Sequence, residues 1–144
     1  MATDFDAMVD ALQEQILEET RKEYSAVVVD HWMHPRNPGP MDDPSGHGRV
    51  TGPCGDTMEI FIRVANDLLT EVRFTTDGCG TSIASASMAV HLATGKALAE
   101  ASAISQVTIL DALDGLPPDS EHCGLLAADT LRAAIDDYLS TTAP

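Results

Sequence analysis

The chain has three cysteines, and each stands among residues that suit a metal centre. They lie in residues 52–56 (GPCGD), 78–80 (GCG) and 121–124 (EHCG), so that Asp56 and His122 fall within two residues of a thiol. Three thiolates with one carboxylate or imidazole make four ligands. That is the number required by zinc or by a small iron–sulfur cluster.

A plainer interpretation is that the cysteines are small buried hydrophobic residues, and their number alone favours it. Their surroundings favour a site. Cys54 is flanked by Pro53 and Gly55 in a predicted turn. Cys79 lies between two glycines, where a strand should give way to a helix, and glycines leave backbone N–H groups free to approach sulfur. Cys123 falls in the first turn of a helix that Ser120 could cap, where the helix dipole favours thiolate.

Asp56 and His122 both compete for the fourth position. Asp56 is two residues from Cys54, so both side chains project to the same side if the segment is extended; the alternative is an aspartate that closes a turn. His122 adjoins Cys123, and both can reach one metal only if the helix N-terminus points at it; the alternative is a surface histidine. For the other histidines we expect His91 to pack between helices and His31, His34 and His47 to lie in loops or at the surface.

Composition indicates one globular domain and excludes some partners. The 144 residues are 44% hydrophobic, and 23 acidic against 8 basic residues give a net charge of −15. Such a surface repels nucleic acid and anionic lipid and suits a basic protein partner. No run is long enough to span a membrane, and the first ten residues resemble neither a signal nor a transit peptide. An odd number of cysteines argues against disulfides and for a reducing cytoplasm.

The hydrophobic pattern predicts an α+β fold: a small three-stranded antiparallel sheet with helices on one face, plus an N-terminal helix. Residues 1–33 read as a helix with an apolar stripe that begins at Phe5, Val9 and Leu12. Residues 57–64 and 70–76 alternate as paired strands, with 49–51 as a third, edge strand; Thr70 should share a face with Val72. Helices should follow over 80–94, from 105 to before 115, and from 120 onward.

In several ordered motifs the chain resembles the IscU/NifU N-terminal family of iron–sulfur cluster assembly scaffolds. The matching segments are residues 24–25 and 34–39, PCGD at 53–56, DGCGTSIAS at 77–85, LPP at 116–118 and HC at 122–123. The resemblance covers about residues 21–139, so we expect two parts: an acidic helical extension over 1–20 and a scaffold domain over 21–144.

The resemblance implies assembly of [2Fe-2S] clusters from iron and from sulfur that an IscS/NifS-like cysteine desulfurase delivers, and their transfer to apo-proteins such as ferredoxin. It makes Cys54, Cys79 and Cys123 the thiolate ligands, with Asp56 or His122 completing the set. It also makes Cys123 the first acceptor of persulfide sulfur, in a segment that should be accessible. The implied protein is a scaffold and sulfur acceptor, not an enzyme. The N-terminal helix would dock the desulfurase, and zinc could fill the cluster-free site.

Two departures from the family pattern bear on partners. The chaperone-recognition segment usually reads LPPVK, but residues 116–120 are LPPDS, which argues against release through a dedicated Hsp70-type chaperone. Residues 1–20 have no clear counterpart. A homodimer stays open, because the sequence does not say whether a cluster is held by one chain or bridges two.

Two rival functions remain. One is a zinc-dependent sulfur acceptor of the SufU type, whose members carry an insertion between the second and third cysteines and usually lack the histidine before the third. Here the interval from Cys79 to Cys123 is short and His122 is present, which favours the scaffold. The other rival is a closed structural zinc module, which would need no glycine on both sides of Cys79.

Overall fold

The computed structural model describes residues 4–142, and within them it leaves out the side chains of residues 16–23 and 142. Its elements in chain order are α1 (Asp4–Glu23), α2 (Ala26–Met33), β1 (Gly46–Thr51), β2 (Thr57–Ala65), β3 (Leu68–Thr76), α3 (Gly80–Ala93), α4 (Leu98–Ser102), α5 (Gln106–Ala112), η1 (Pro118–Ser120) and α6 (Glu121–Thr142). The strands form one antiparallel sheet in the order β1-β2-β3. The expected α+β class is confirmed.

The sheet forms because β2 and β3 alternate apolar and polar residues, so each buries one face. Met58, Ile60 and Ile62 of β2 are fully buried. The register slips between Arg63 and Val64, where Val64 pairs with Leu69. That bulge buries Leu69 and leaves Thr70 exposed, so the expectation that Thr70 shares the buried face with Val72 was wrong.

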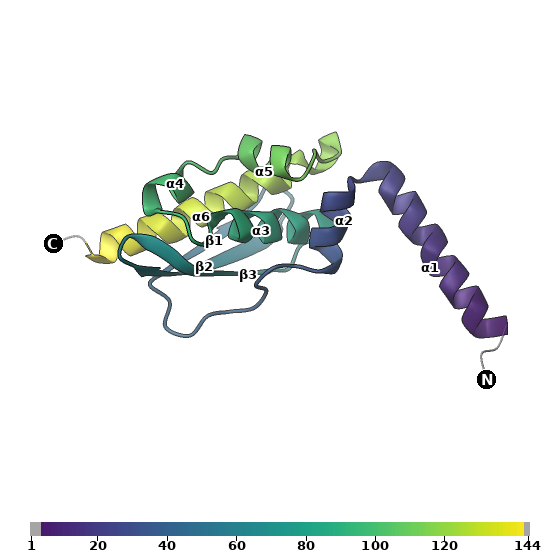
Figure 1. Cartoon of the computed structure of the whole chain (residues 1–144). Helices are drawn as coiled ribbons and strands as arrows, with labels where there is room; N and C mark the ends of the chain where they lie inside the picture. The colour runs from purple at the N-terminus through teal and green to yellow at the C-terminus, as the bar shows by residue number, and fades with distance from the viewer. Residues whose placement is uncertain (1–3, 143–144) are drawn as a thin grey trace.

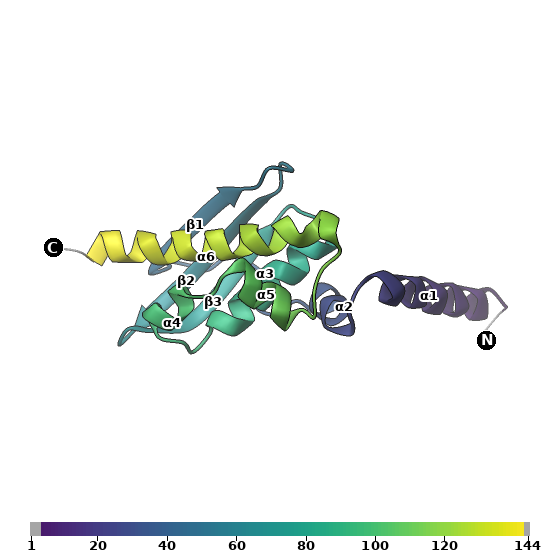
Figure 2. The same ribbon diagram turned by 90° about the horizontal axis from the view of Figure 1, so that it is seen from above.

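The helices cover one face of the sheet, with α6 lying along it beside α3 (Figures 1 and 2). Glycines in β1 permit this close approach. A Cβ on Gly48 would stand 2.4 Å from the backbone oxygen of Thr130, and one on Gly46 would stand 2.4 Å from that of Ala134. β1 begins at Gly46, so this edge strand is longer than the expected 49–51. The two glycines at its start leave room for the backbone of α6.

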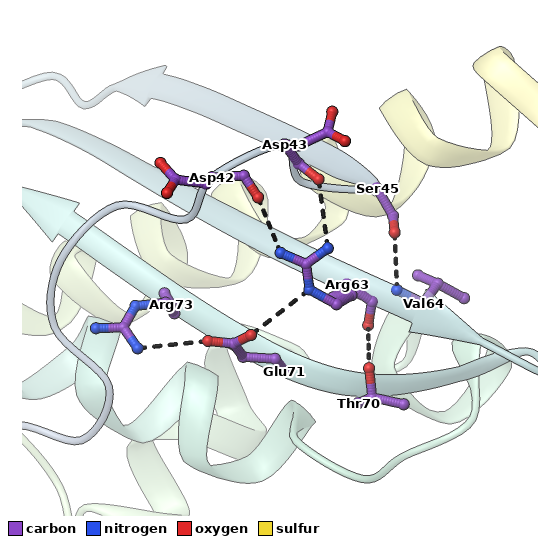
Figure 3. A network of polar contacts seen from close by, with 8 residues as sticks. All are labelled: Asp42, Asp43, Ser45, Arg63, Val64, Thr70, Glu71 and Arg73. Carbon is purple, nitrogen blue, oxygen red and sulfur yellow. Dashed lines mark hydrogen bonds and ion pairs between the residues drawn. The ribbon is translucent and has the colours of Figure 1, made fainter.

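The other face of the sheet is polar and is crossed by the loop between α2 and β1 (Figures 1 and 3). Arg63 donates to the backbone oxygen of Asp42 at 2.9 Å and pairs with Glu71 at 3.6 Å. Glu71 also pairs with Arg73, whose second nitrogen donates to the backbone oxygen of Pro38 at 2.7 Å. These contacts hold the loop between α2 and β1 against the polar face of the sheet.

The N-terminal region is two helices and not the single one expected. Ser25 breaks it: its side chain caps α2 by accepting from the N–H of Val28 at 3.1 Å, while its hydroxyl donates to the backbone oxygen of Leu113. α1 then projects away from the body of the molecule (Figures 1 and 2). Phe5, Met8 and Leu12 on this helix are exposed.

The expectation for His31 was also wrong, whereas the contact between helices expected of His91 is present, at the surface. His31 is buried in the contact between α2 and α3, where its Nδ1 lies 2.7 Å from the Oγ of Ser87. His91 is exposed, with its ring edge-to-face against that of His31. None of the helices in residues 4–142 is long and apolar enough to cross a membrane.

Candidate functional site

The five predicted ligands come from three places that meet at one end of the sheet. Cys54 and Asp56 lie in the turn between β1 and β2, Cys79 is the N-cap of α3, and His122 with Cys123 lie in the first turn of α6. Thr57 and Asp77 tie the first two places together. The N–H of Thr57 donates to Oδ1 of Asp77 at 2.7 Å, and the N–H of Asp77 donates to the backbone oxygen of Thr57 at 3.2 Å.

The turn that carries Cys54 is held by its own backbone. The N–H of Gly52 donates to the carbonyl of Asp56 at 2.8 Å, and the N–H of Gly55 donates to that of Gly52 at 3.0 Å. Gly55 has a φ of +91°, a conformation that favours glycine. Cys54 is therefore presented on an exposed turn, beside a carboxylate whose backbone position is fixed.

The glycines around Cys79 make room for neighbouring side chains. A Cβ on Gly78 would lie 2.5 Å from Ser82 Oγ and 2.8 Å from Asp56 Oδ2. A Cβ on Gly80 would lie 2.3 Å from the ring of Trp32. From the sequence, these glycines are expected to leave backbone N–H groups free to approach sulfur. In the structure, the absence of a side chain at Gly78 lets Asp56 reach the start of α3. The absence of one at Gly80 makes room for the ring of Trp32 from α2.

Thr81 and Ser82, in the first turn of α3, join the ligands through their hydroxyl groups. Thr81 Oγ1 is 3.2 Å from Cys79 Sγ and 3.5 Å from Cys123 Sγ. Ser82 Oγ is 3.5 Å from Cys123 Sγ and donates to Asp56 Oδ2 at 3.1 Å. Two hydroxyls thus contact two of the thiols and the carboxylate.

Cys123 is buried, with 2% of its surface exposed, whereas Cys54 and Cys79 are exposed. The expectation that Cys123 stands in an accessible segment was wrong for this conformation. The reason is that the first turn of α6 packs on α3, where the Cys123 sulfur contacts the hydroxyls of Thr81 and Ser82. His122 Nε2 lies 3.8 Å from Cys123 Sγ, so adjacent side chains at this helix start do face one point.

The sulfur of Cys79 sits in a setting that favours thiolate. Its pKa is lowered, chiefly by the hydroxyl of Thr81, with burial acting in the opposite direction. The backbone N–H groups of Ser82 and Thr81 lower it further. Hydrogen-bond donors at a helix N-terminus stabilise the negative form of the sulfur.

Four of the five predicted ligands are thus linked, and Cys54 stands apart. Within residues 4–142, Cys54 shares no hydrogen bond with the others, and no three His, Cys, Asp or Glu side chains form a ready metal centre. The donor set of three thiols, a carboxylate and an imidazole suits soft and borderline metals.

Thr81, Ser82 and Trp32 also contribute to the site, although the sequence did not indicate them as site residues. The hydroxyl pair follows Cys79 by two and three residues, and side chains in the first turn of a helix can turn back to its N-terminal end. That position was the available signal for Thr81 and Ser82. The sequence offered none for Trp32.

Comparison with known proteins gives one family and several close relatives. The family model described as "NifU-like N terminal domain" matches residues 23–143. The iron–sulfur cluster assembly scaffold protein IscU 1 of Archaeoglobus fulgidus is 46% identical over 116 residues, covering 80% of this chain and 76% of that protein. The IscU scaffold protein of Escherichia coli K12 is 43% identical over 122 residues, covering 81% and 94%.

A solved structure shares the fold at low identity. It is of a protein from Fervidobacterium islandicum AW-1 assigned to the SUF system as an iron–sulfur cluster assembly scaffold. Its TM-score is 0.65 at 19% identity, over 80% of this chain and 98% of that one. The family match starts at residue 23, so most of α1 lies outside it. The division into residues 1–20 and 21–144 stays a prediction.

Proposed function

The chain belongs to the NifU-like N-terminal domain family, and from this premise we propose that it is a scaffold that assembles iron–sulfur clusters and transfers them to apo-proteins. Relatives at 43–46% identity are named iron–sulfur cluster assembly scaffold proteins. The cluster is cargo, built and then given away. The protein is therefore a scaffold and sulfur acceptor and not an enzyme in the usual sense.

The observation that carries the proposal is the meeting of Cys79, Cys123 and Asp56 on the hydroxyls of Thr81 and Ser82. We assign Cys54, Cys79 and Cys123 as the thiolate ligands of a [2Fe-2S] cluster. His122, beside Cys123, and Asp56 are the candidates for the remaining position. A carboxylate or imidazole in place of a fourth thiolate holds iron in a sulfide-rich cluster less firmly, which suits release.

Sulfur delivery requires a nucleophilic thiolate, and we assign that role to Cys123. Its thiolate attacks the outer sulfur of a desulfurase persulfide, the S–S bond on the desulfurase breaks, and the desulfurase thiolate leaves. Because Cys123 is buried in the free chain, the first turn of α6 has to move before this attack. Docking of the desulfurase is the natural trigger.

The proposed partners follow from the same assignment. They are an IscS/NifS-like cysteine desulfurase and apo-proteins such as ferredoxin that accept the cluster. The acidic residue Asp119, exposed in the LPPDS segment, argues against an Hsp70-type chaperone that reads a basic one. The same charge of −15 that disfavours nucleic acid and anionic membranes fits work in the cytoplasm among proteins.

The test is anaerobic reconstitution with a desulfurase, cysteine, ferrous iron and a dithiol reductant, which supplies the electrons that reduce persulfide sulfur to sulfide. Visible absorption and analysis of iron and acid-labile sulfide follow. We expect visible charge-transfer bands, equal amounts of iron and sulfide, and transfer of the cluster to apo-ferredoxin. The Cys79→Ser variant should form far less cluster. A protein that stays colourless with one bound zinc, and still accepts sulfur, would instead identify the zinc-dependent sulfur acceptor.

A further inference from the structure

Two groups at the centre of the site are not ligands of the cluster, yet they contact most of the residues that are. They are the hydroxyls of Thr81 and Ser82 in the first turn of α3. We propose that Thr81 and Ser82 are positioning residues, which hold Cys79, Cys123 and Asp56 in one arrangement before iron arrives. This inference rests on the proposed function, because it concerns how the same site is prepared.

Because the two hydroxyls are buried, their hydrogen bonds to the site side chains are the main interactions open to them. Thr81 is 5% exposed and Ser82 is fully buried, so water does not replace their partners. Buried hydroxyls in proteins are nearly always hydrogen-bonded. One partner, Cys79, lies two residues before Thr81, and the others are site side chains from two other segments, 26 to 42 residues away along the chain.

The two hydroxyls do different things, because each has only one proton to donate. Ser82 gives its proton to Asp56, so towards Cys123 it can act only as an acceptor. Thr81 lies between the sulfurs of Cys79 and Cys123 and can donate to one while accepting from the other. Together they fix the carboxylate against one thiol and the two thiols against each other.

α3 also contains a matched control. Ser85 is fully buried on the same helix, and its hydroxyl has no partner among the described residues. Removing that hydroxyl deletes a buried polar group from the same helix without touching a ligand. A difference between Ser85→Ala and changes at Thr81 or Ser82 therefore reports the contacts to the ligands.

Ligands that are already positioned lose less conformational freedom when a metal binds. Without the Thr81 hydroxyl, the two sulfurs lose their common partner. Without the Ser82 hydroxyl, Asp56 loses its hydrogen bond and is free to turn to solvent. One hydrogen bond to a charged group corresponds to roughly a tenfold change in an equilibrium, and sulfur is a weaker partner, so we expect metal affinity to fall roughly threefold to tenfold per hydroxyl.

The experiment uses Co²⁺ alone on the full-length chain under anaerobic conditions. Sulfur-to-cobalt charge-transfer absorption gives the affinity and reports the thiolates around the metal. Thr81→Val, which keeps the side-chain shape, and Ser82→Ala should each bind Co²⁺ more weakly, while Ser85→Ala should match the wild type. Thr81→Ser should recover the affinity, because it restores the hydroxyl. Thermal unfolding of the metal-free proteins shows whether each variant is folded.

Wild-type affinity in both Thr81→Val and Ser82→Ala would overturn the proposal, as would failure of Thr81→Ser to recover it. If Thr81→Val unfolds at a lower temperature than Ser85→Ala, the proposal is judged by comparing the Co²⁺ affinity of Ser82→Ala with that of Ser85→Ala. The proposed function is tested separately by cluster assembly with the desulfurase. A wild-type protein that binds Co²⁺ through thiolates but builds no cluster would refute the function, and the Co²⁺ affinities would still judge the two hydroxyls.

Discussion

At the residue scale, the three thiols differ in exposure and therefore in what they can do first. Cys54 and Cys79 face solvent, whereas Cys123 is held between Thr81 and Ser82. An incoming metal meets the exposed thiols before the buried one. The order of events we propose begins at Cys79, whose pKa is lowered by the Thr81 hydroxyl, and needs the first turn of α6 to open for Cys123.

The side chain of Asp56 provides the sharpest test of lability. We expect Asp56→Ala to keep the fold, because the bond that closes its turn runs from Gly52 N–H to the Asp56 backbone carbonyl. It should still bind metal, hold a [2Fe-2S] cluster longer, and transfer it more slowly to apo-ferredoxin. The reason is that another group, such as His122, must then complete the site. Decay of the visible bands under a chelator and the transfer rate measure both effects.

Asp56→Asn separates the charge from the hydrogen bond. It keeps an oxygen for Ser82 but removes the anionic ligand, so its cluster should last as long as that of Asp56→Ala. Faster cluster loss in both variants than in the wild type would show that Asp56 stabilises the cluster. The labile-ligand account would then be wrong.

The cysteines, Asp56 and His122 could be chosen as candidates from the sequence because local residues mark them: glycines, a proline and a helix start. The structure brings four of the five together, and their role as ligands stays a prediction. The hydroxyls of Thr81 and Ser82 look like ordinary first-turn residues in the same sequence. Their partner Cys123 lies 42 and 41 residues further along the chain. Its burial also depends on how α6 meets α3, which no local pattern contains.

At the element scale, the helices and strands with a regular hydrophobic period could be predicted from the sequence. Features that depend on a single long-range contact could not. The paired strands and α3 follow from alternation and from a 3.6-residue repeat. α5 begins at Gln106, next to the start expected at residue 105, and Ser105 is its N-cap. The break between α1 and α2 depends on a bond from Ser25 to Leu113, 88 residues away. The short helix α4, Leu98–Ser102, was missed because five residues give almost no periodic signal.

The contact between α2 and α3 should make stability depend on pH through His31. Burial, with smaller effects of Arg36 and His91 against that of Asp30, lowers the His31 pKa from 6.5 to about 4. The unfolded chain therefore takes up this proton first as the pH falls. The stabilisation is complete above about pH 6.5 and is lost towards pH 4, with roughly 2 kcal/mol gone by pH 4.5.

Urea unfolding of the wild type and His31→Gln between pH 7 and 4.5 checks this expectation. The quantity compared is the slope of the unfolding free energy against pH. Carboxylates contribute to both proteins alike, so the difference between the two slopes isolates His31. The exposed residue His34 supplies the control, and His34→Gln should keep the wild-type slope. Equal slopes for all three proteins would show that His31 is not the group that links the two helices to pH.

At the scale of the whole molecule, helix α1 projects away from the sheet and the helices that cover it (Figure 1). The body carries the site at one end of its sheet. On α1, Phe5, Met8, Val9 and Leu12 form an exposed apolar face, with Asp10 and Glu14 towards the other side. An exposed apolar helix face marks a contact surface, and the acidic side favours a basic partner. The proposed desulfurase would then bind α1 in an apolar groove with basic edges.

Leu12 and Gln13 offer a matched pair to test that contact, because they are neighbours on the same helix and face different ways. Leu12→Ser should weaken desulfurase binding roughly tenfold, since it removes one apolar side chain from the interface. Gln13→Ser has a similar effect on helix propensity but lies off the apolar face, so its affinity should stay within about twofold of the wild type. Calorimetric titration measures both, and added salt should weaken binding by screening the acidic side. Equal affinities for Leu12→Ser and Gln13→Ser would place the desulfurase contact on the body of the molecule, and the apolar face of α1 would then need another partner.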